Sequence, residues 1–228
     1  MTKFSVAIDG PAGAGKSTIA KAAAQALGFL YVDTGAIYRT VGLGAKQRGY
    51  APDDRANVVA MLPALEIDMR YVDGVQRMFL DGEDVSEAIR TPEASHYASN
   101  VAAMPEVRAF LMDMQRSMAR RYDVLMDGRD IGTVVLPDAQ LKIFLTASAE
   151  ERARRRYAQL LEKGTEETYE SVLAEIIERD KRDSERETAP LKQAEDAVLL
   201  DTSDMTPAES IQAVIDLVDA RRKEGASL

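Results

Sequence analysis

The 228-residue chain contains no cysteine. Disulfide bonds and thiolate metal sites are therefore excluded, and the composition suits a reducing compartment. Long hydrophobic runs are also missing, since no apolar stretch approaches the ~20 residues that a helix needs to cross a bilayer. The N-terminus leads straight into a strand-like run, without the basic segment and apolar core of a signal peptide. We therefore expect a cytoplasmic protein.

Positive charge is the scarcer sign, because 29 Lys and Arg residues are outnumbered by 38 Asp and Glu residues and the net charge is −9. This balance argues against broad attraction to nucleic acid or to an anionic membrane, and we expect neither as a partner. An anionic substrate would have to be bound by local clusters of arginine. The length is sufficient for one large α/β domain or for a core with an insertion, and we expect a monomer.

The most informative segment covers residues 10–17 and reads Gly-Pro-Ala-Gly-Ala-Gly-Lys-Ser. It follows an apolar run at residues 6–8 and leads into a helical segment at residues 18–28. A strand, a glycine-rich loop and a helix in this order are the context of a phosphate-binding P-loop. The glycines let backbone N–H groups point into one concavity, and the positive end of the helix dipole faces the same anion. The alternative is a glycine-rich turn that binds nothing.

A P-loop of this kind predicts roles for two side chains. Lys16 would stabilise the outer phosphates of ATP, and the Ser17 hydroxyl would coordinate Mg²⁺ directly. The spacing Gly-x-x-Gly-x-Gly-Lys is typical of small-molecule and nucleotide kinases, and no Asn-Lys-x-Asp segment is present to read guanine. The predicted ATP-binding residues are Gly10, Pro11, Ala12, Gly13, Ala14, Gly15, Lys16, Ser17 and Thr18.

The remaining pattern predicts an α/β fold with a small antiparallel insertion. Apolar runs at residues 4–8, 29–32, 124–126, 141–145 and 198–201 alternate with helical segments, which indicates a parallel sheet with crossover helices. Residues 65–85 break this pattern, since they alternate with a period of two around the turn signals Asp73-Gly74 and Asp81-Gly82. A long helix should begin at Pro105, and we expect its inward face to carry Val107, Phe110, Leu111, Met114 and Met118. Further helices are expected at about residues 149–162 and 169–181.

Charged residues follow two of the predicted strands. In a doubly wound sheet, ligands collect at the carboxyl ends of the strands. Arg39 lies in the segment that follows the second strand and would bind a second phosphate, or it is a solvated helix charge. Asp127 ends the third strand, where a carboxylate would hold Mg²⁺ through a water molecule. Arg129 and Asp130 would then point into the same cleft, unless residues 127–130 form a charged turn without a ligand.

Arginine is concentrated at two places further along the chain. Arg152, Arg154, Arg155 and Arg156 share one predicted helix, and Arg179, Arg182 and Arg186 follow a glycine-broken connection. Phosphoryl transfer needs positive charge around the transferred group and exclusion of water, which a closing arginine-bearing lid would supply. Interleaved acidic residues leave open that these are two salt-bridged helix faces.

Taken together, these segments resemble the bacterial cytidylate kinases (CMP/dCMP kinases) of the nucleoside-monophosphate kinase superfamily, along nearly the whole chain. Residues 33–39 (Asp-Thr-Gly-Ala-Ile-Tyr-Arg) and 127–135 (Asp-Gly-Arg-Asp-Ile-Gly-Thr-Val-Val) are the most diagnostic, and residues 8–17, 80–85 and 179–183 add to the match. The small sheet resembles the insert that distinguishes this family from adenylate kinases. Thr34 stands where relatives often have serine, and the hydroxyl is kept.

The resemblance implies a core of the P-loop NTPase type with a five-stranded parallel sheet. Residues 1–35, 105–148 and 166–228 would form this core, and residues 36–104 a domain for the nucleoside monophosphate, with its insert at about residues 63–90. Residues 149–165 would form a short lid, and the lid arginines would be Arg152, Arg155 and Arg156.

The resemblance also implies the site residues. Lys16, Arg39 and Arg129 would be catalytic. Arg39, Arg129 and Arg186 would hold the acceptor phosphate, Ser99, Arg108 and Asp130 would read the cytosine edge, and Arg179 and Asp183 would meet the pentose, with Thr34 nearby. Ser17 and Asp127 would hold the metal.

The expected activity is reversible transfer of a phosphoryl group from ATP, with Mg²⁺, to CMP or dCMP, giving CDP or dCDP. One alternative is another P-loop kinase that acts on UMP, AMP or a small alcohol such as shikimate. A more distant alternative is a nucleotide-gated ATPase without a phosphoryl acceptor.

Overall fold

The computed structural model describes residues 3–162, 164 and 166–226. The chain divides into two compact units, which we call unit 1 (Met1–Tyr31 with Tyr122–Leu228) and unit 2 (Val32–Arg121). The predicted return to the core at residue 105 differs from this division, because the helix that begins there groups with unit 2. The assignment of core, monophosphate-binding and lid regions stays a prediction, and residues 163 and 165 of the predicted lid lie outside the described part.

The main sheet is parallel and has five strands, as predicted. They are β1 (Ser5–Asp9), β2 (Leu30–Asp33), β6 (Val124–Gly128), β7 (Leu141–Thr146) and β8 (Val198–Asp201), in the spatial order β2-β6-β1-β7-β8. β1 pairs in parallel with both β6 and β7 at the centre of the sheet. The P-loop therefore leaves the most central strand, whose side chains are all buried.

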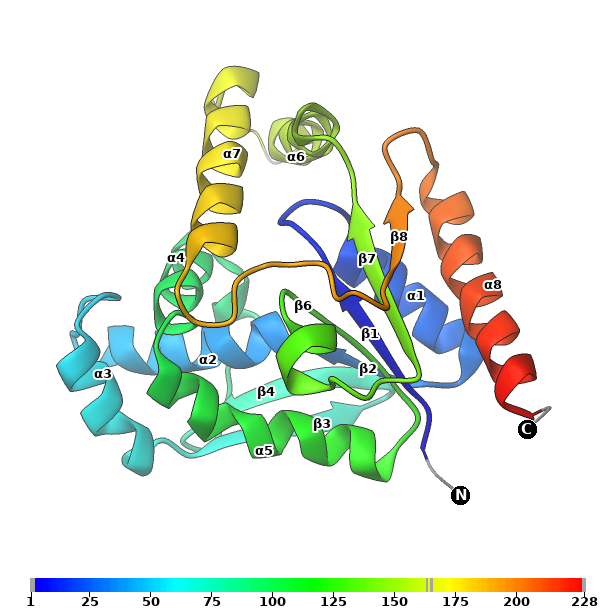
Figure 1. Ribbon diagram of the computed structural model, residues 1–228. Helices are drawn as coiled ribbons and strands as arrows, with labels where there is room; N and C mark the ends of the chain where they lie inside the picture. Colours follow the sequence, from blue (N-terminus) through cyan, green and yellow to red (C-terminus); the bar gives the residue numbers. More distant parts are fainter. Residues whose placement is uncertain (1–2, 163, 165, 227–228) are drawn as a thin grey trace. The chain divides into compact units, whose positions relative to one another are not determined.

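Unit 1 also contains α1 (Lys16–Leu27), α6 (Ala149–Glu162), α7 (Tyr169–Glu185) and α8 (Pro207–Ala226), and a short helical turn η3 covers Ile131–Val135. Helices α6 and α7 pack on each other around a small apolar core of their own. Helices α1 and α8 run side by side (Figure 1) and bury apolar side chains against the strands. The start of α8 is a capping box, since Thr206 Oγ1 accepts from the Glu209 N–H and the Glu209 carboxylate accepts from the Thr206 N–H.

Unit 2 combines helices with the predicted antiparallel insert. Its helices are α2 (Thr34–Gln47), α3 (Arg55–Met61), α4 (Pro92–Val101) and α5 (Pro105–Arg121), with short turns η1 (Leu62–Ala64) and η2 (Ala88–Arg90). The insert sheet consists of β3 (Ile67–Val72), β4 (Val75–Leu80) and β5 (Glu83–Asp84) in that order. Asp73 and Gly74 both have positive φ, of 52° and 74°, which joins β3 to β4 by the tight turn that the sequence predicts.

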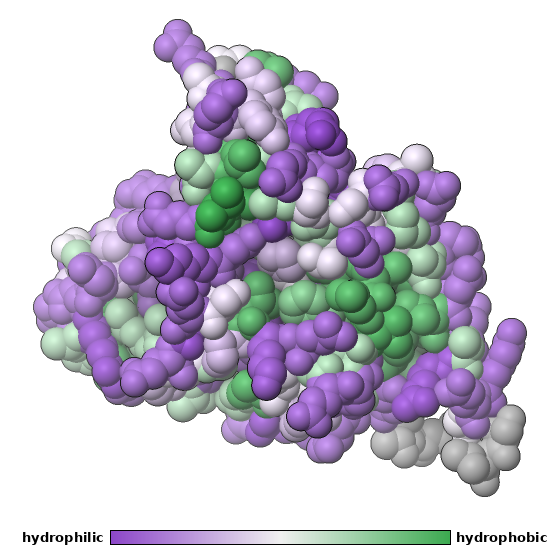
Figure 2. All heavy atoms as spheres, turned by 45° about the horizontal axis from the view of Figure 1, so that its top comes forward, coloured by the Kyte–Doolittle hydropathy of each residue, from purple (hydrophilic) through white to green (hydrophobic). Residues whose placement is uncertain are grey.

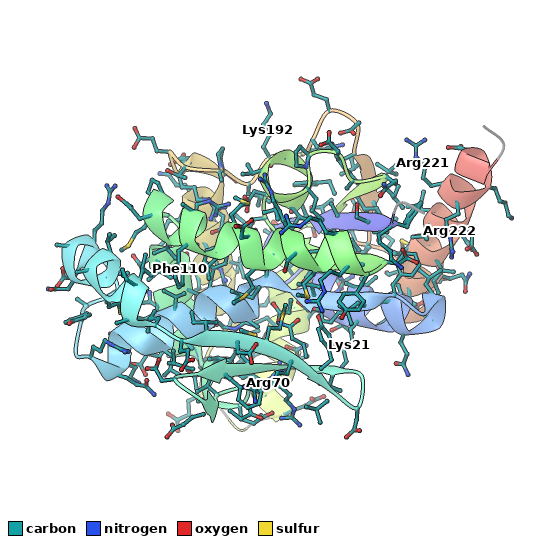
Figure 3. The ribbon with its side chains drawn as sticks, turned by 90° about the horizontal axis from the view of Figure 1, so that it is seen from below. Lys21, Arg70, Phe110, Lys192, Arg221 and Arg222 are labelled. Atoms are coloured by element: carbon teal, nitrogen blue, oxygen red, sulfur yellow. The ribbon has the colours of Figure 1, made fainter. Side chains whose placement is uncertain are left out.

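The prediction for the inward face of α5 was wrong at Phe110. That side chain is 39% exposed (Figure 3), whereas Val107 and Leu111 are completely buried. The buried stripe continues through Arg108 and Gln115 instead. Hydropathy favours Phe110 for the interior, but two polar residues occupy the buried face instead. Arg108 donates to the carbonyl oxygen of Ala102, and Gln115 donates through Nε2 to that of Leu111.

Apolar side chains also remain at the surface of unit 1. Val198 and Leu199 of the edge strand β8 are both exposed. Figure 2 shows hydrophobic residues in patches among hydrophilic ones on one face of the molecule. Within the part of the chain that the structure describes, no helix is long and apolar enough to cross a membrane.

Candidate functional site

The loop between β1 and α1 has the conformation that a phosphate site needs. Three glycines of this loop have positive φ values that residues with a Cβ rarely adopt: 150° at Gly10, 77° at Gly13 and 86° at Gly15. At Gly10 a Cβ would also lie only 1.9 Å from the carbonyl oxygen of Leu145. Gly15 is the N-cap of α1 and supplies no side-chain cap, so the first N–H groups of the helix are left for an anion.

Lys16 is the buried cation of this loop. Its Nζ donates to the carbonyl oxygen of Pro11 at 2.7 Å, and the residue is only 6% exposed. Burial and the neighbouring Arg129 guanidinium lower the pKa of Lys16 well below its ordinary value, and the Asp127 carboxylate partly opposes this shift. The hydrogen-bond acceptor of Lys16 Nζ is a neutral carbonyl oxygen, and an incoming phosphate would give this ammonium group a negatively charged partner.

Ser17 and Asp127, for which the sequence predicts metal binding from two separate motifs, lie in contact beside the loop. The Ser17 hydroxyl donates to Asp127 Oδ2 at 2.8 Å, and the Tyr31 hydroxyl donates to Oδ1 at 3.1 Å. Asp127 is buried at the end of β6. A hydroxyl and a carboxylate are the oxygen ligands that Mg²⁺ uses at nucleotide phosphates, so the donor set fits this metal. Among the described residues, no three acidic, histidine or cysteine side chains form a metal cluster.

Asp9 is a further buried carboxylate that the sequence reasoning missed. It accepts hydrogen bonds from the backbone N–H groups of Ile131 and Gly132, both at 2.7 Å. Burial raises the pKa of Asp9 to about 6, although these two hydrogen bonds work in the opposite direction. Asp9 thereby fixes the turn that follows Arg129 and Asp130. The available signal was a charged residue directly after the apolar run Val6-Ala7-Ile8, at the last position of its strand.

A network of arginines and carboxylates follows β6. Arg129 Nε donates to Asp183 Oδ2 at 2.8 Å, and Arg186 Nη2 lies 3.5 Å from Asp130 Oδ1. Burial acts to raise the pKa of Asp183, but the nearby guanidinium groups of Arg129, Arg179 and Arg186 outweigh it and hold that pKa below its ordinary value. The structure thus brings together five residues that the resemblance implied for the acceptor nucleotide.

The arginines of α6 separate into different environments. Arg152 is buried, and its guanidinium donates to the carbonyl oxygens of Ala12 (3.0 Å) and Ala147 (2.9 Å) and to both carboxylate oxygens of Asp180 (3.0 and 2.6 Å). Arg155 donates to the carbonyl oxygen of Thr202 at 2.6 Å. Arg156 is half-buried, and Arg154 is exposed and pairs with Glu151. Arg152 is therefore a brace between the P-loop, α6 and α7, with its donors already used.

We predict that Arg152→Ala destabilises the protein strongly. The substitution leaves the Asp180 carboxylate and two carbonyl oxygens without a buried partner, and removal of one member of a buried ion pair costs about 3–5 kcal/mol. Urea unfolding of purified variants measures this change. Arg154→Ala is the matched control, since that side chain is 69% exposed on the same helix, and it should change the free energy of unfolding by about 0.5 kcal/mol or less. Equal effects of the two substitutions would contradict the prediction.

In unit 2, the residues predicted to bind the acceptor lie on three helices. Thr34 is the buried first residue of α2, and Arg39 on the same helix pairs with Asp33 at 2.8 Å. Arg108 of α5 is buried, donates to the carbonyl oxygen of Ala102 at 3.3 Å and lies over the Tyr38 ring, 5.7 Å from its centroid. Ser99 is half-buried on α4.

Comparisons with known proteins identify the family. A model of the family described as cytidylate kinase matches residues 6–220. A cytidylate kinase from Caldicellulosiruptor bescii is 52% identical over 217 residues, which cover 95% of this chain and 96% of that protein. One from Caldanaerobacter subterraneus is 52% identical over 218 residues, covering 96% of each chain. The crystal structure of a gluconokinase from Sinorhizobium meliloti has a TM-score of 0.50 at 15% identity, over 99% of this chain and 98% of that one, and shares the fold alone.

Proposed function

Because the chain belongs to the cytidylate kinase family, we propose that it transfers the γ-phosphoryl group of ATP reversibly to CMP or dCMP, giving ADP and CDP or dCDP. The observation that carries this proposal, beside the family, is the arrangement around the P-loop. The central strand β1 leads into the loop, and its neighbour β6 carries Asp127 at its last position but one. Arg129 and Asp130, which follow β6, pair with Asp183 and Arg186 at the end of α7.

On the donor side, the P-loop amides and Lys16 bind the β- and γ-phosphates of ATP. They stabilise negative charge on the transferred group without moving, because the loop and the ammonium are already in place. Ser17 would bind Mg²⁺ directly and Asp127 would bind it through a water molecule. Bound there, the metal neutralises the charge that accumulates on the phosphate oxygens.

On the acceptor side, Arg39, Arg129 and Arg186 bind the phosphate of the monophosphate and orient its attacking oxygen. No general base is required, because this oxygen is already ionised near neutral pH. Asp183 now pairs with Arg129, so the entering phosphate competes with a carboxylate for the same guanidinium group. With Arg179, the displaced Asp183 carboxylate can then accept hydrogen bonds from the hydroxyl groups of the pentose.

The base is selected by donor–acceptor complementarity. Cytosine presents an amino group beside a ring nitrogen and a carbonyl oxygen, and we propose that Asp130, Arg108 and Ser99 bind this edge. Uracil presents a carbonyl oxygen where cytosine has the amino group, so Asp130 would place an acceptor against an acceptor. A mismatch of this kind between buried polar groups costs large factors in kcat/KM.

We also propose that the protein works as a monomer in the cytoplasm, without a nucleic-acid or membrane partner. The net charge of −9 and the absence of cysteine support this. In a lid at residues 149–165, Arg152, Arg155 and Arg156 would be the arginines that reach the phosphates. Arg152 would first have to release Ala12, Ala147 and Asp180, and Arg155 would have to release Glu151 and Thr202.

The substrate assignment predicts a clear order among acceptors. With ATP and Mg²⁺, kcat/KM should be highest for CMP and dCMP and lower for UMP and AMP by about two orders of magnitude or more. A coupled assay of ADP formation over a panel of monophosphates and shikimate measures this. Preference for UMP, AMP or shikimate would replace the assignment by another P-loop kinase, and ATP hydrolysis that no monophosphate diverts into diphosphate would indicate an ATPase.

A further inference from the structure

The core-facing row of the insert sheet contains one polar residue in an apolar position. On β4, Met78 and Leu80 are buried in the core of unit 2, and the alternation of a strand puts Gln76 on the same face. Arg77 lies on the opposite face, directly across from Arg70 of β3 in the register of the two strands. A side-chain amide at the end of an apolar row needs polar partners.

Gln76 bonds to both the N–H and the carbonyl oxygen of one residue, and its Nε2 also lies 3.4 Å from Met78 Sδ. Its Oε1 accepts from the N–H of Asp33 at 2.8 Å, and its Nε2 donates to the carbonyl oxygen of Asp33 at 3.2 Å. A side-chain amide carries the same donor and acceptor as a peptide group, so Gln76 bonds to Asp33 as a neighbouring strand would. Asp33 is where β2 ends and α2 begins, and its main chain is thereby fixed.

Asp33 in turn orients Arg39. Its Oδ1 accepts from the N–H of Ala36 at 2.9 Å and caps α2, while its Oδ2 accepts from Arg39 Nη2 at 2.8 Å. A Cβ at Gly35 would come within 2.9 Å of Arg39 Nη1, so the guanidinium group lies directly against the first turn of the helix. Arg39 Nε is buried and has no hydrogen-bond partner among the described residues. Its orientation thus depends on the Asp33 carboxylate.

We propose that Gln76 is a positioning residue for the acceptor: through Asp33, it holds Arg39 in the orientation that binds the phosphate of the nucleoside monophosphate. This inference rests on the role proposed above for Arg39. It gives the antiparallel insert a part in substrate binding, since the middle strand of the insert sets the geometry of a guanidinium group on α2. Gln76, Asp33 and Arg39 all belong to unit 2.

The substitution Gln76→Leu tests this relay. It keeps most of the side-chain volume and removes both hydrogen bonds to Asp33. We expect KM for CMP to rise about tenfold, with KM for ATP unchanged, because loss of two hydrogen bonds lets the Asp33–Arg39 pair leave its productive position. Arg77→Ala is the matched control on the same strand and opposite face, and it should leave both KM values unchanged.

A double-mutant cycle separates positioning from a general structural effect. In an Arg39→Met background, Gln76→Leu should raise KM for CMP no further, since Gln76 acts only through Arg39. The inference would be overturned if the factors by which the two substitutions raise KM for CMP multiplied in the double variant. It would also be overturned if Gln76→Leu raised KM for ATP as much as KM for CMP. If Gln76→Leu does not fold, Gln76→Glu serves instead. It keeps an acceptor for the Asp33 N–H and loses the donor, so KM for CMP should rise about threefold, again only while Arg39 is present.

The outcome is distinguishable from failure of the proposed function. If the wild-type protein does not phosphorylate CMP in the acceptor panel, the function itself is wrong. If the wild type does so and Gln76→Leu retains the wild-type KM for CMP, the function stands and only the role of Gln76 is refuted.

Discussion

Lys16→Met should lower turnover by about three orders of magnitude, with the fold intact. The methionine side chain has a similar length but carries no charge, so the stabilisation of the developing negative charge on the transferred phosphoryl group is lost. Such a loss inside a water-excluded site is not replaced by solvent. Steady-state kinetics with saturating ATP and CMP measure the change in kcat.

Stability should respond differently from activity in this variant. Because burial holds the pKa of Lys16 well below its ordinary value, the charged form is disfavoured in the folded protein, and its removal should cost little in the free energy of unfolding. Lys21→Met is the matched control on the exposed side of the same helix (Figure 3) and should leave kcat unchanged. Retention of more than about a tenth of wild-type turnover by a folded Lys16→Met protein would contradict the role assigned to this ammonium.

Arg129→Met should lower kcat/KM for CMP by about 100- to 1000-fold and leave KM for ATP within about a factor of three. Its guanidinium group binds the acceptor phosphate in the proposed function, and methionine offers no donor in its place. Initial rates at varied CMP and fixed ATP measure the change. If Arg129→Met kept the wild-type kcat/KM for CMP, the role of this guanidinium group in binding the acceptor phosphate would be refuted.

The same substitution should also make stability depend differently on pH. Arg129 contributes to the low pKa of Asp183 in the folded protein. A carboxylate of this kind stabilises the fold at pH values above its pKa in the unfolded chain, and the stabilisation is lost as the pH falls through its pKa in the folded protein. The free energy of unfolding lost in Arg129→Met should therefore be larger at pH 7 than in acid, where Asp183 is protonated in both proteins. Arg182→Met, an exposed position on α7, is the control and should show neither the kinetic loss nor this pH dependence.

Local chemistry explains why much of the fold could be predicted. The glycines and the Lys-Ser pair of the P-loop, the turn at Asp73 and Gly74, and the capping box at Thr206 each act on neighbouring residues in the chain. The same holds for the alternation of apolar and polar residues, because one face of each strand or helix is buried whichever element packs against it. These features depend on spacing, and spacing is written in the sequence.

Buried polar side chains and partners that are distant in the chain explain the failures. The inward face of α5 could not be found because the polar residues Arg108 and Gln115 are buried, each donating to a carbonyl oxygen close by in the chain, while Phe110 remains exposed. In the arginine cluster of α6, nothing in the sequence distinguishes Arg152 from Arg154. Their difference depends on the carbonyl oxygen of Ala12, which is 140 positions away from Arg152.

The sequence by itself determined the chemical groups of this protein: a P-loop, a hydroxyl and a carboxylate of the kind that Mg²⁺ prefers, and two clusters of arginine. The tertiary structure decided how those groups are held. Asp9 accepts a hydrogen bond from Ile131, which is 122 positions away in the chain. Gln76 accepts one from Asp33, which is 43 positions away. A buried hydrogen bond is specified jointly by two distant segments and by the burial that makes its loss costly, so neither segment reveals it alone.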